Sequence, residues 1–266
     1  MADLNPIAAW RRLLAMPNES RTKTIVMAFL VSAVCAVLVS AATVILRPIQ
    51  AANRAAEEQA RIEALVAGIP GMSELLNSAG GSLSTVVIDL ARGAAAGDVT
   101  PDTLGAALAD PGNWTALDPA ADIAELGQRP DYAQIFLLRD ESDRISLVLL
   151  PVGGAGFNGR IDAIVALRGD MNTIAGMAVT RQSETPGLGA RIEEPAWQAH
   201  FAGKQFADES GAVRFAVARG PASSSHEVDG ITGATRTGNA ITRIMRFWLG
   251  PDGYGPLIAA IRRGEF

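Results

Sequence analysis

Cysteine is almost missing from this chain, and its scarcity excludes two kinds of site. Cys35 is the only cysteine among 266 residues, and it lies inside a long apolar run where it acts as a small packing residue. An iron–sulfur cluster needs several thiolates and a disulfide needs two cysteines, so the chain forms neither by itself. The region after this run also has no disulfide that would reveal its redox compartment.

Histidine is nearly as scarce, and the patterns of several enzyme classes are missing. His200 and His226 are the only histidines, and neither stands at a metal-ligand spacing. The GxSxG string of many serine hydrolases and the Walker A string are absent. The net charge of −5 argues against a nucleic-acid partner. We therefore expect no metal site, no catalytic residue of its own and no nicotinamide site in this chain.

One segment departs from globular composition. Residues 25–46 contain no charged side chain, and as a helix they span roughly 33 Å, enough for a bilayer core of roughly 30 Å. The alternative is a cleaved signal peptide, because Ser40-Ala41-Ala42 resembles a cleavage site. The apolar core of a signal peptide is only about 7–15 residues long, which favours a retained transmembrane helix. Without ionisable groups, this helix is an anchor and not an ion path.

Flanking charges predict the orientation and the domain boundaries. Four basic residues precede the apolar run, whereas two arginines and then two glutamates follow it: Arg11, Arg12, Arg21, Lys23; Arg47, Arg54; Glu57, Glu58. This bias predicts a cytoplasmic segment at 1–24 and a domain at 69–266 that lies outside the cytoplasm. Between them, residues 47–68 form a juxtamembrane helix, rich in Ala, Glu, Gln and Arg and stopped by Gly68 and Pro70.

The remaining pattern predicts an α+β domain with a mostly antiparallel sheet and flanking helices. Strand-like runs occur at Ser84–Leu90, Ile135–Leu138, Ile145–Val152, Ile161–Leu167, Ile174–Thr180 and Val213–Ala218. Residues 140–143 are typical of a hairpin turn. Helices are expected at Pro195–Ala202 and Thr237–Leu249, and residues 92–131 should be loops with a short helix. Because the strands are consecutive, neighbouring strands pair antiparallel.

The most informative string is DGITGAT, residues 229–235. An apolar face with helical spacing follows it, formed by Ile241, Ile244, Met245, Trp248 and Leu249. The spacing puts Thr235 near the N-terminus of a helix, where free backbone N–H groups and the helix dipole favour a phosphate. Gly233 and Ala234 leave room around its hydroxyl. The alternative is an ordinary helix cap, since threonine is a common capping residue.

A second string, ETPGLG, occupies residues 184–189. By itself it predicts a tight turn, because Pro186 suits the second position of a type II turn and Gly187 the third, which needs positive φ. A plain surface loop is therefore the simple interpretation.

Together these strings resemble the C-type subunits of the Na⁺-translocating NADH:quinone reductases, within the FMN-binding domain family. The similarity rests on the anchor, VVIDL at 86–90, ETPGLG, DGITGAT and the closing segment from Phe247 to Phe266. It covers nearly the whole chain and is clearest from Leu150 onward. The G-type subunits of RNF-type electron-transport complexes share the DGxTGAT motif but lack the GPDGYGP run and are generally shorter.

The resemblance implies that FMN is joined covalently through its phosphate to Thr235, by a separate flavin transferase. Asp229, Gly230, Thr232, Gly233 and Ala234 would form the acceptor loop. The flavin-contact loop would contain Glu184, Thr185, Gly187, Leu188 and Gly189. The chain would be one of six subunits in a complex of the bacterial inner membrane, with its domain in the periplasm. It would pass electrons from NADH toward ubiquinone, while its polytopic partners transport sodium.

Two departures from the family and two rival functions stay open. The family usually has a histidine at the place of Gln182 and commonly has Leu-Trp where this chain has Phe157-Asn158. One rival is another flavoprotein, such as the RNF-type subunit. The other is a non-redox assembly protein with one membrane helix, in which DGxTGAT is only a cap.

Overall fold

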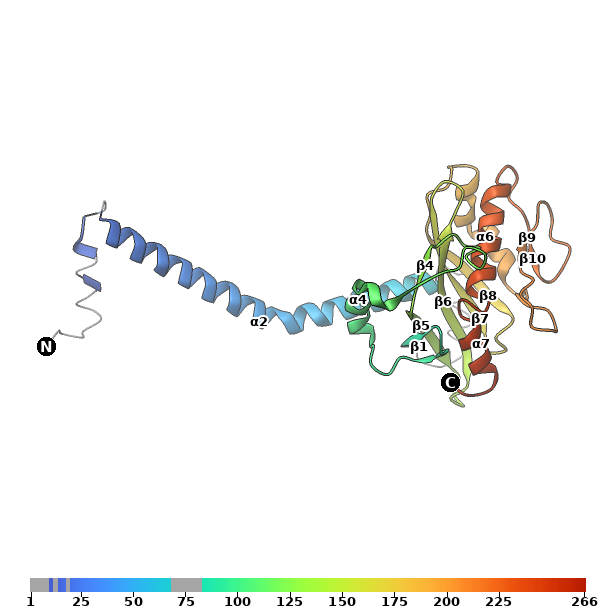
Figure 1. Cartoon of the computed structure of the whole chain (residues 1–266), viewed down its shortest axis with the longest axis horizontal. Coiled ribbons are helices and arrows are strands. Elements are labelled where there is room, and N and C mark those ends of the chain that lie inside the picture. The colour runs from blue at the N-terminus through green and yellow to red at the C-terminus, as the bar shows by residue number, and fades with distance from the viewer. Residues whose placement is uncertain (1–9, 12–13, 18–19, 68–82) are drawn as a thin grey trace. The chain divides into compact units, whose positions relative to one another are not determined.

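The computed structural model describes residues 10–11, 14–17, 20–67 and 83–266 (Figure 1). The chain divides into two compact units, Met1–Ile62 and Glu63–Phe266. The first contains most of one long helix, and the second contains a sheet with its covering helices. Each unit is described by itself.

The N-terminal unit is dominated by α2 (Arg21–Ala67), a helix of 47 residues. Its segment Arg21–Ala41 has a mean hydropathy of 2.5 and no buried residue, and within the described residues it is long and apolar enough to cross a membrane. The apolar run and the juxtamembrane segment expected at 47–68 thus belong to one continuous helix. Gly68 and Pro70, expected to stop this helix, lie outside the described residues.

The second unit is built on a six-stranded antiparallel sheet, as the sequence predicts. Its spatial order is β2 (Ala94–Ala95), β1 (Leu83–Asp89), β5 (Tyr132–Arg139), β6 (Ile145–Ala155), β7 (Arg160–Arg168), β8 (Ile174–Arg181). The turn expected at 140–143 joins β5 to β6, with Asp143 at φ 61°. Successive side chains of a strand point to opposite faces, and consecutive apolar residues therefore bury both faces of this sheet: the neighbours Val148 and Leu149 in β6 are 0% and 1% exposed.

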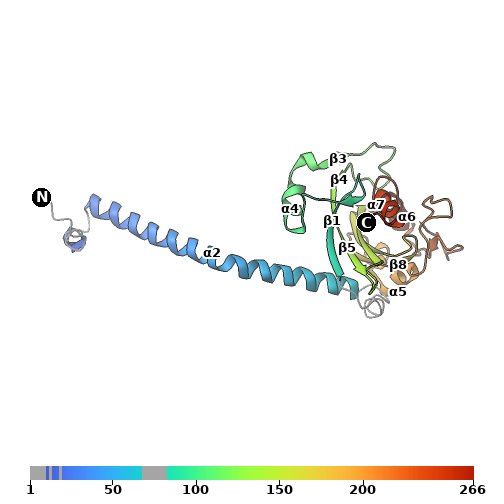
Figure 2. The same ribbon diagram turned by 90° about the horizontal axis from the view of Figure 1, so that it is seen from below.

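The helix after DGITGAT covers one face of the sheet. It is α6 (Thr235–Trp248), which packs on β6, and all five apolar residues predicted for its inner face are buried. Two hydrogen bonds fix its end and the next helix, α7 (Gly255–Arg262): Trp248 Nε1 donates to Gly153 O at 2.6 Å, and Tyr254 Oη donates to Pro151 O at 2.7 Å. Both views place α4 (Pro101–Ala109) on the opposite side of the sheet (Figures 1 and 2).

Among the smaller elements, one strand and one helix differ from the sequence prediction. They are η1 (Pro111–Asn113), β3 (Trp114–Ala116), β4 (Gln128–Pro130), η2 (Gly189–Glu193), α5 (Pro195–Gln198), η3 (Ala199–Phe201), β9 (Ala216–Val217) and β10 (Glu227–Val228). The strand expected at Val213–Ala218 shrinks to β9, because the amides of Arg214 and Phe215 both donate to Phe206 O and so break the strand alternation. The helix expected at Pro195–Ala202 is α5 followed by a 3₁₀ turn.

A glycine string in the β6–β7 turn bears on the expected absence of a nicotinamide site. Residues 154–159 are Gly-Ala-Gly-Phe-Asn-Gly, which matches the GxGxxG fingerprint. A dinucleotide site needs this string between a parallel strand and a helix. Here it joins two antiparallel strands, and Gly156 N donates to Gly159 O at 2.7 Å. The string therefore lacks the strand-to-helix setting that a dinucleotide site needs.

Candidate functional site

The ETPGLG and DGITGAT strings, about 45 residues apart in the sequence, meet at one pocket. Its cavity volume is about 320 Å³, and it is lined by Phe157, Glu184, Thr185, Leu188, Gly189, Gly233, Ala234, Thr235, Arg236 and Thr237. The first turn of α6 forms one wall, the loop after β8 another, and the β6–β7 turn contributes Phe157. This pocket contains seven of the eleven residues that the sequence singled out.

Thr235 is the first residue of α6, and its side chain is exposed. The N-cap position belongs to Ala234, which has no side-chain oxygen, so the interpretation of Thr235 as the capping residue is wrong at this helix. Among the described residues, the Thr235 hydroxyl has no hydrogen-bond partner. Its oxygen is therefore accessible to another molecule, at a helix end whose backbone N–H groups are unpaired.

The neighbouring threonines differ from Thr235 in burial and bonding. Thr237 is 2% exposed, and its Oγ1 donates to Glu184 Oε2 at 2.6 Å. Thr232 is exposed but does not line the pocket. Gly233, at φ 80°, keeps the entrance clear, because a Cβ there would lie 3.1 Å from Leu188 Cδ2. Within this string, only Thr235 combines an exposed hydroxyl with a place in the pocket wall.

Glu184 joins the three walls of the pocket. Its side chain is buried, 4% exposed, and Oε1 accepts hydrogen bonds from the backbone N–H groups of Phe157 at 2.7 Å and Asn158 at 3.1 Å. Its other oxygen accepts from Thr237 on α6. Gly189 must lack a side chain, since a Cβ there would lie 2.7 Å from Glu184 Oε2. The carboxylate thus acts as a clamp between segments.

The loop after Glu184 is the tight turn that the sequence predicts. Leu188 N donates to Thr185 O at 3.1 Å, and Gly187 has φ 74°, the positive value that a type II turn needs at this position. The turn presents Leu188 at the pocket mouth with 45% of its surface exposed. Gly187 itself is not part of the pocket lining.

Phe157 and Arg236 form the remaining side of the mouth. The Phe157 ring is 52% exposed, and the Arg236 guanidinium carbon lies 4.9 Å from the ring centroid, a cation–π contact. With Leu188, this ring gives the mouth two exposed apolar surfaces, which suit a flat aromatic group. Arg236 and Glu184 are the two charged residues of the lining.

The first part of the DGITGAT string shapes the approach to the pocket and does not line it. Asp229 Oδ1 accepts from Ala222 N at 2.7 Å, its backbone oxygen accepts from Trp197 Nε1 at 2.8 Å, and Oδ2 lies 3.3 Å from His200 Nδ1. Gly230 N donates to Gly220 O at 2.8 Å. These contacts hold the loop that leads to Thr235.

Sequence patterns did not assign three lining residues, Phe157, Arg236 and Thr237, to the site. The signal for Thr237 was its place two residues after Thr235, in the first turn of the helix. Phe157-Asn158 was noticed only as a departure from the family, as was Gln182. Both departures lie at Glu184: Gln182 Oε1 accepts from Glu184 N at 2.5 Å, and the backbone N–H groups of Phe157 and Asn158 donate to Glu184 Oε1.

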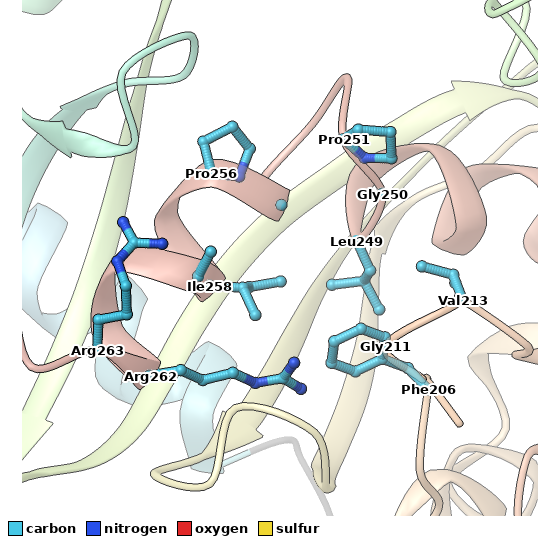
Figure 3. Close-up of a pocket in the computed structure, with 12 residues that line it drawn as sticks. Phe206, Gly211, Val213, Leu249, Gly250, Pro251, Pro256, Ile258, Arg262 and Arg263 are labelled. Atoms are coloured by element: carbon cyan, nitrogen blue, oxygen red, sulfur yellow. The ribbon is translucent and has the colours of Figure 1, made fainter. Parts of the chain in front are cut away.

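A larger pocket, of about 590 Å³, lies at the other end of α6. Leu249, Ile258 and Phe206 lie along its wall, and Arg262 and Arg263 extend from the end of α7 at its edge (Figure 3). It contains no residue of either string, so its size does not make it the functional site. In the described part of the chain, no group of three or more His, Cys, Asp or Glu residues is placed to hold a metal ion.

Comparisons with known proteins agree on one family. A model of the FMN-binding domain matches residues 156–250, which include both strings. The C-type subunit of the Na⁺-translocating NADH-quinone reductase of Pseudomonas aeruginosa is 36% identical over 93% of this chain and 98% of its own length. That of Vibrio anguillarum is 35% identical over 94% and 99%. The crystal structure of Shewanella oneidensis NqrC superposes with a TM-score of 0.61 at 29% identity, covering 72% of this chain and 88% of that one.

Proposed function

Because the chain belongs to the family of NqrC subunits of the Na⁺-translocating NADH-quinone reductases, we propose that it carries FMN covalently on Thr235. It is a subunit of that complex, and its domain is an FMN-binding domain. The observation that carries the proposal is the exposed, unbonded hydroxyl of Thr235 in a pocket lined by both strings. Neither the RNF-type alternative nor a non-redox assembly protein is favoured by a specific observation.

The pocket fits the group in chemistry and shape. A phosphate on Thr235 would lie at the N-terminus of a 14-residue helix, whose unpaired N–H groups favour an anion. The apolar surfaces of Phe157 and Leu188 would hold the ring system, and Gly189 and Gly233 leave the space that side chains would fill. FMN supplies the redox chemistry when bound, and the protein supplies its position and surroundings.

Attachment is a phosphoryl transfer that this chain undergoes and does not catalyse. The Thr235 Oγ–P bond forms, the hydroxyl proton leaves, and the phosphoanhydride bond of an activated flavin nucleotide breaks, releasing a nucleoside monophosphate. The added mass is FMN minus one water. A separate flavin transferase must reach the hydroxyl, which its exposure allows.

In the assembled enzyme, the domain relays electrons between the subunit that oxidises NADH and the flavins that lead to ubiquinone. The helix α2 anchors it, with residues 1–24 in the cytoplasm and the domain from 69 onward in the periplasm, and 25–46 in the bilayer. Arg21 and Lys23 at the start of α2 support this orientation. Sodium passes through other subunits, because the apolar run at 25–46 has no charged side chain that could serve an ion path.

A single variant of the whole complex tests the relay. Thr235→Ala should stop quinone reduction in the assembled enzyme, while NADH oxidation by an artificial acceptor at the upstream flavin continues. Thr180→Ala, a substitution of the same kind at an exposed threonine outside both strings and the pocket lining, should leave both activities unchanged. Quinone reduction at the normal rate by the Thr235→Ala complex would reject the relay role.

A further inference from the structure

Arg236 is the positively charged residue in the lining of the Thr235 pocket, and its charge is not neutralised by a carboxylate. Glu184, the other charged residue there, is buried and bound to three donors. Arg236 is exposed, and among the described residues it forms no ion pair with a carboxylate. Its one recorded contact is the cation–π contact with the Phe157 ring, 4.9 Å away.

This contact orients the guanidinium and leaves its hydrogen-bond donors free. A guanidinium stacks through its flat face, whereas its N–H groups point outward in its plane. Those in-plane donors match the oxygens of a phosphate, which arginine binds in a bidentate manner. Phe157 therefore holds Arg236 at the pocket mouth with its donors available.

We propose that Arg236 is the phosphate-binding residue of this pocket and positions the FMN phosphate beside the Thr235 hydroxyl. This inference rests on the proposed function, since it concerns the same pocket. Arg236 directly follows Thr235 in the first turn of α6, so a phosphate on that hydroxyl lies within reach of its side chain.

The proposal predicts that the chain recognises FMN before any covalent bond forms. Riboflavin has the same ring system and lacks the phosphate, so the two ligands separate recognition of the phosphate from recognition of the ring. Because the contact is between charges at an exposed mouth, added salt should weaken it.

The test uses the full chain in detergent, with Thr235→Ala to prevent attachment and no flavin transferase present. Titration with FMN and with riboflavin, followed by flavin fluorescence, should give at least tenfold tighter binding of FMN at low salt. Adding Arg236→Leu should bring the two affinities to within about twofold and leave riboflavin binding unchanged, and Arg236→Gln should do the same. Phe157→Ala should weaken the binding of both FMN and riboflavin.

A matched control lies on the same helix. Arg243 is seven residues, or about 10 Å, further along α6 and pairs with Glu125 at 3.1 Å, away from the pocket lining. Arg243→Leu removes an equal charge and should preserve the preference for FMN. Equal affinities for FMN and riboflavin in the Thr235→Ala chain, or an equal loss of both in Arg236→Leu, would overturn the proposal.

The covalent attachment has a separate readout, so the two proposals fail independently. If the chain with an intact Thr235 gains FMN mass from the transferase but its Thr235→Ala variant shows no preference for FMN, the role of Arg236 is wrong and the covalent flavin stands. If the preference exists but no mass is gained, phosphate recognition stands and covalent attachment is wrong.

Discussion

At the scale of single residues, Glu184 is the side chain on which the shape of the pocket depends. Its carboxylate accepts from Phe157 N, Asn158 N and Thr237 Oγ1. Glu184→Ala should lower the free energy of unfolding by about 3 kcal/mol, because buried donors lose a charged acceptor. Glu184→Gln should cost about 1 kcal/mol, since its amide oxygen still accepts from the two backbone groups.

Urea unfolding of the parent, Glu184→Gln and Glu184→Ala proteins measures whether their free energies of unfolding fall in this order. The control is Glu194→Ala, which removes an exposed carboxylate paired with Arg191 on the surface and should change stability by less than about 1 kcal/mol. A Glu184→Ala protein as stable as the parent would show that the clamp does not hold the pocket together.

The sequence predicted a site formed by Thr235 and the two strings. It did not show which of their residues line the pocket and which hold its walls together. Glu184 was expected in a flavin-contact loop, and its burial could not be foreseen because its partners lie 26 and 53 positions away. Arg236 is unremarkable as sequence, since an exposed arginine on a helix is normal. Only the fold brings it over Phe157.

At the scale of elements, α6 was predictable from its helical hydrophobic period, and the strands of the sheet were predictable from their short apolar runs. Ile244, which is 2% exposed, shows the consequence. Ile244→Ala should cost about 2–5 kcal/mol through lost burial and a cavity. Asn239→Ala, on the exposed face of the same helix, should change stability by no more than about 0.5 kcal/mol. Similar unfolding midpoints for both variants would contradict this packing.

Short elements were less predictable, because long-range contacts decide them. The amides of Arg214 and Phe215 donate to the same carbonyl, that of Phe206, and this ends a run that looks like a strand. The small antiparallel pair of β3 and β4 lies in a segment rich in Ala, Gly, Pro and Asp. This segment shows neither a helical hydrophobic period nor a long apolar run. The hydrophobic pattern of the sequence therefore predicted the elements that form the core. It failed for short elements whose ends are decided by tertiary hydrogen bonds.

The hydrogen bond between Tyr254, just before α7, and Pro151 in β6 makes the stability of the domain depend on pH. Complete burial raises the pKa of Tyr254 far above its ordinary value of 10.0, and its hydroxyl donates to Pro151 O. The unfolded chain loses this proton near pH 10.0, whereas the folded chain keeps it. The contribution of Tyr254 to the free energy of unfolding is therefore fully present below that pH and falls as the pH rises above it.

Unfolding free energies measured from about pH 8 to 11 check this dependence. Tyr254→Phe should cost about 1 kcal/mol at about pH 8 and should flatten the fall above about pH 10. Tyr132→Phe removes the other tyrosine and should leave the fall unchanged. A Tyr254→Phe protein with the parent's decline would assign the pH dependence to other groups.

At the scale of the whole molecule, the account predicts a periplasmic domain on a retained anchor. A reporter active only in the periplasm, fused after Phe266, should be active, and one active only in the cytoplasm should be silent. The mature protein should keep its N-terminal segment, because the apolar run is longer than that of a signal peptide. Protection of the domain from protease in intact spheroplasts would contradict the orientation.

The central claim is that FMN is joined to Thr235, and an intact-mass measurement tests it most directly. The full chain produced with its flavin transferase should gain the mass of FMN minus one water. Thr180→Ala should gain the same mass, because this exposed threonine lies outside both strings and the pocket lining. Thr235→Ala should gain nothing while its thermal unfolding stays cooperative. A flavin mass that persists in Thr235→Ala, or that disappears in Thr180→Ala instead, would contradict attachment at Thr235.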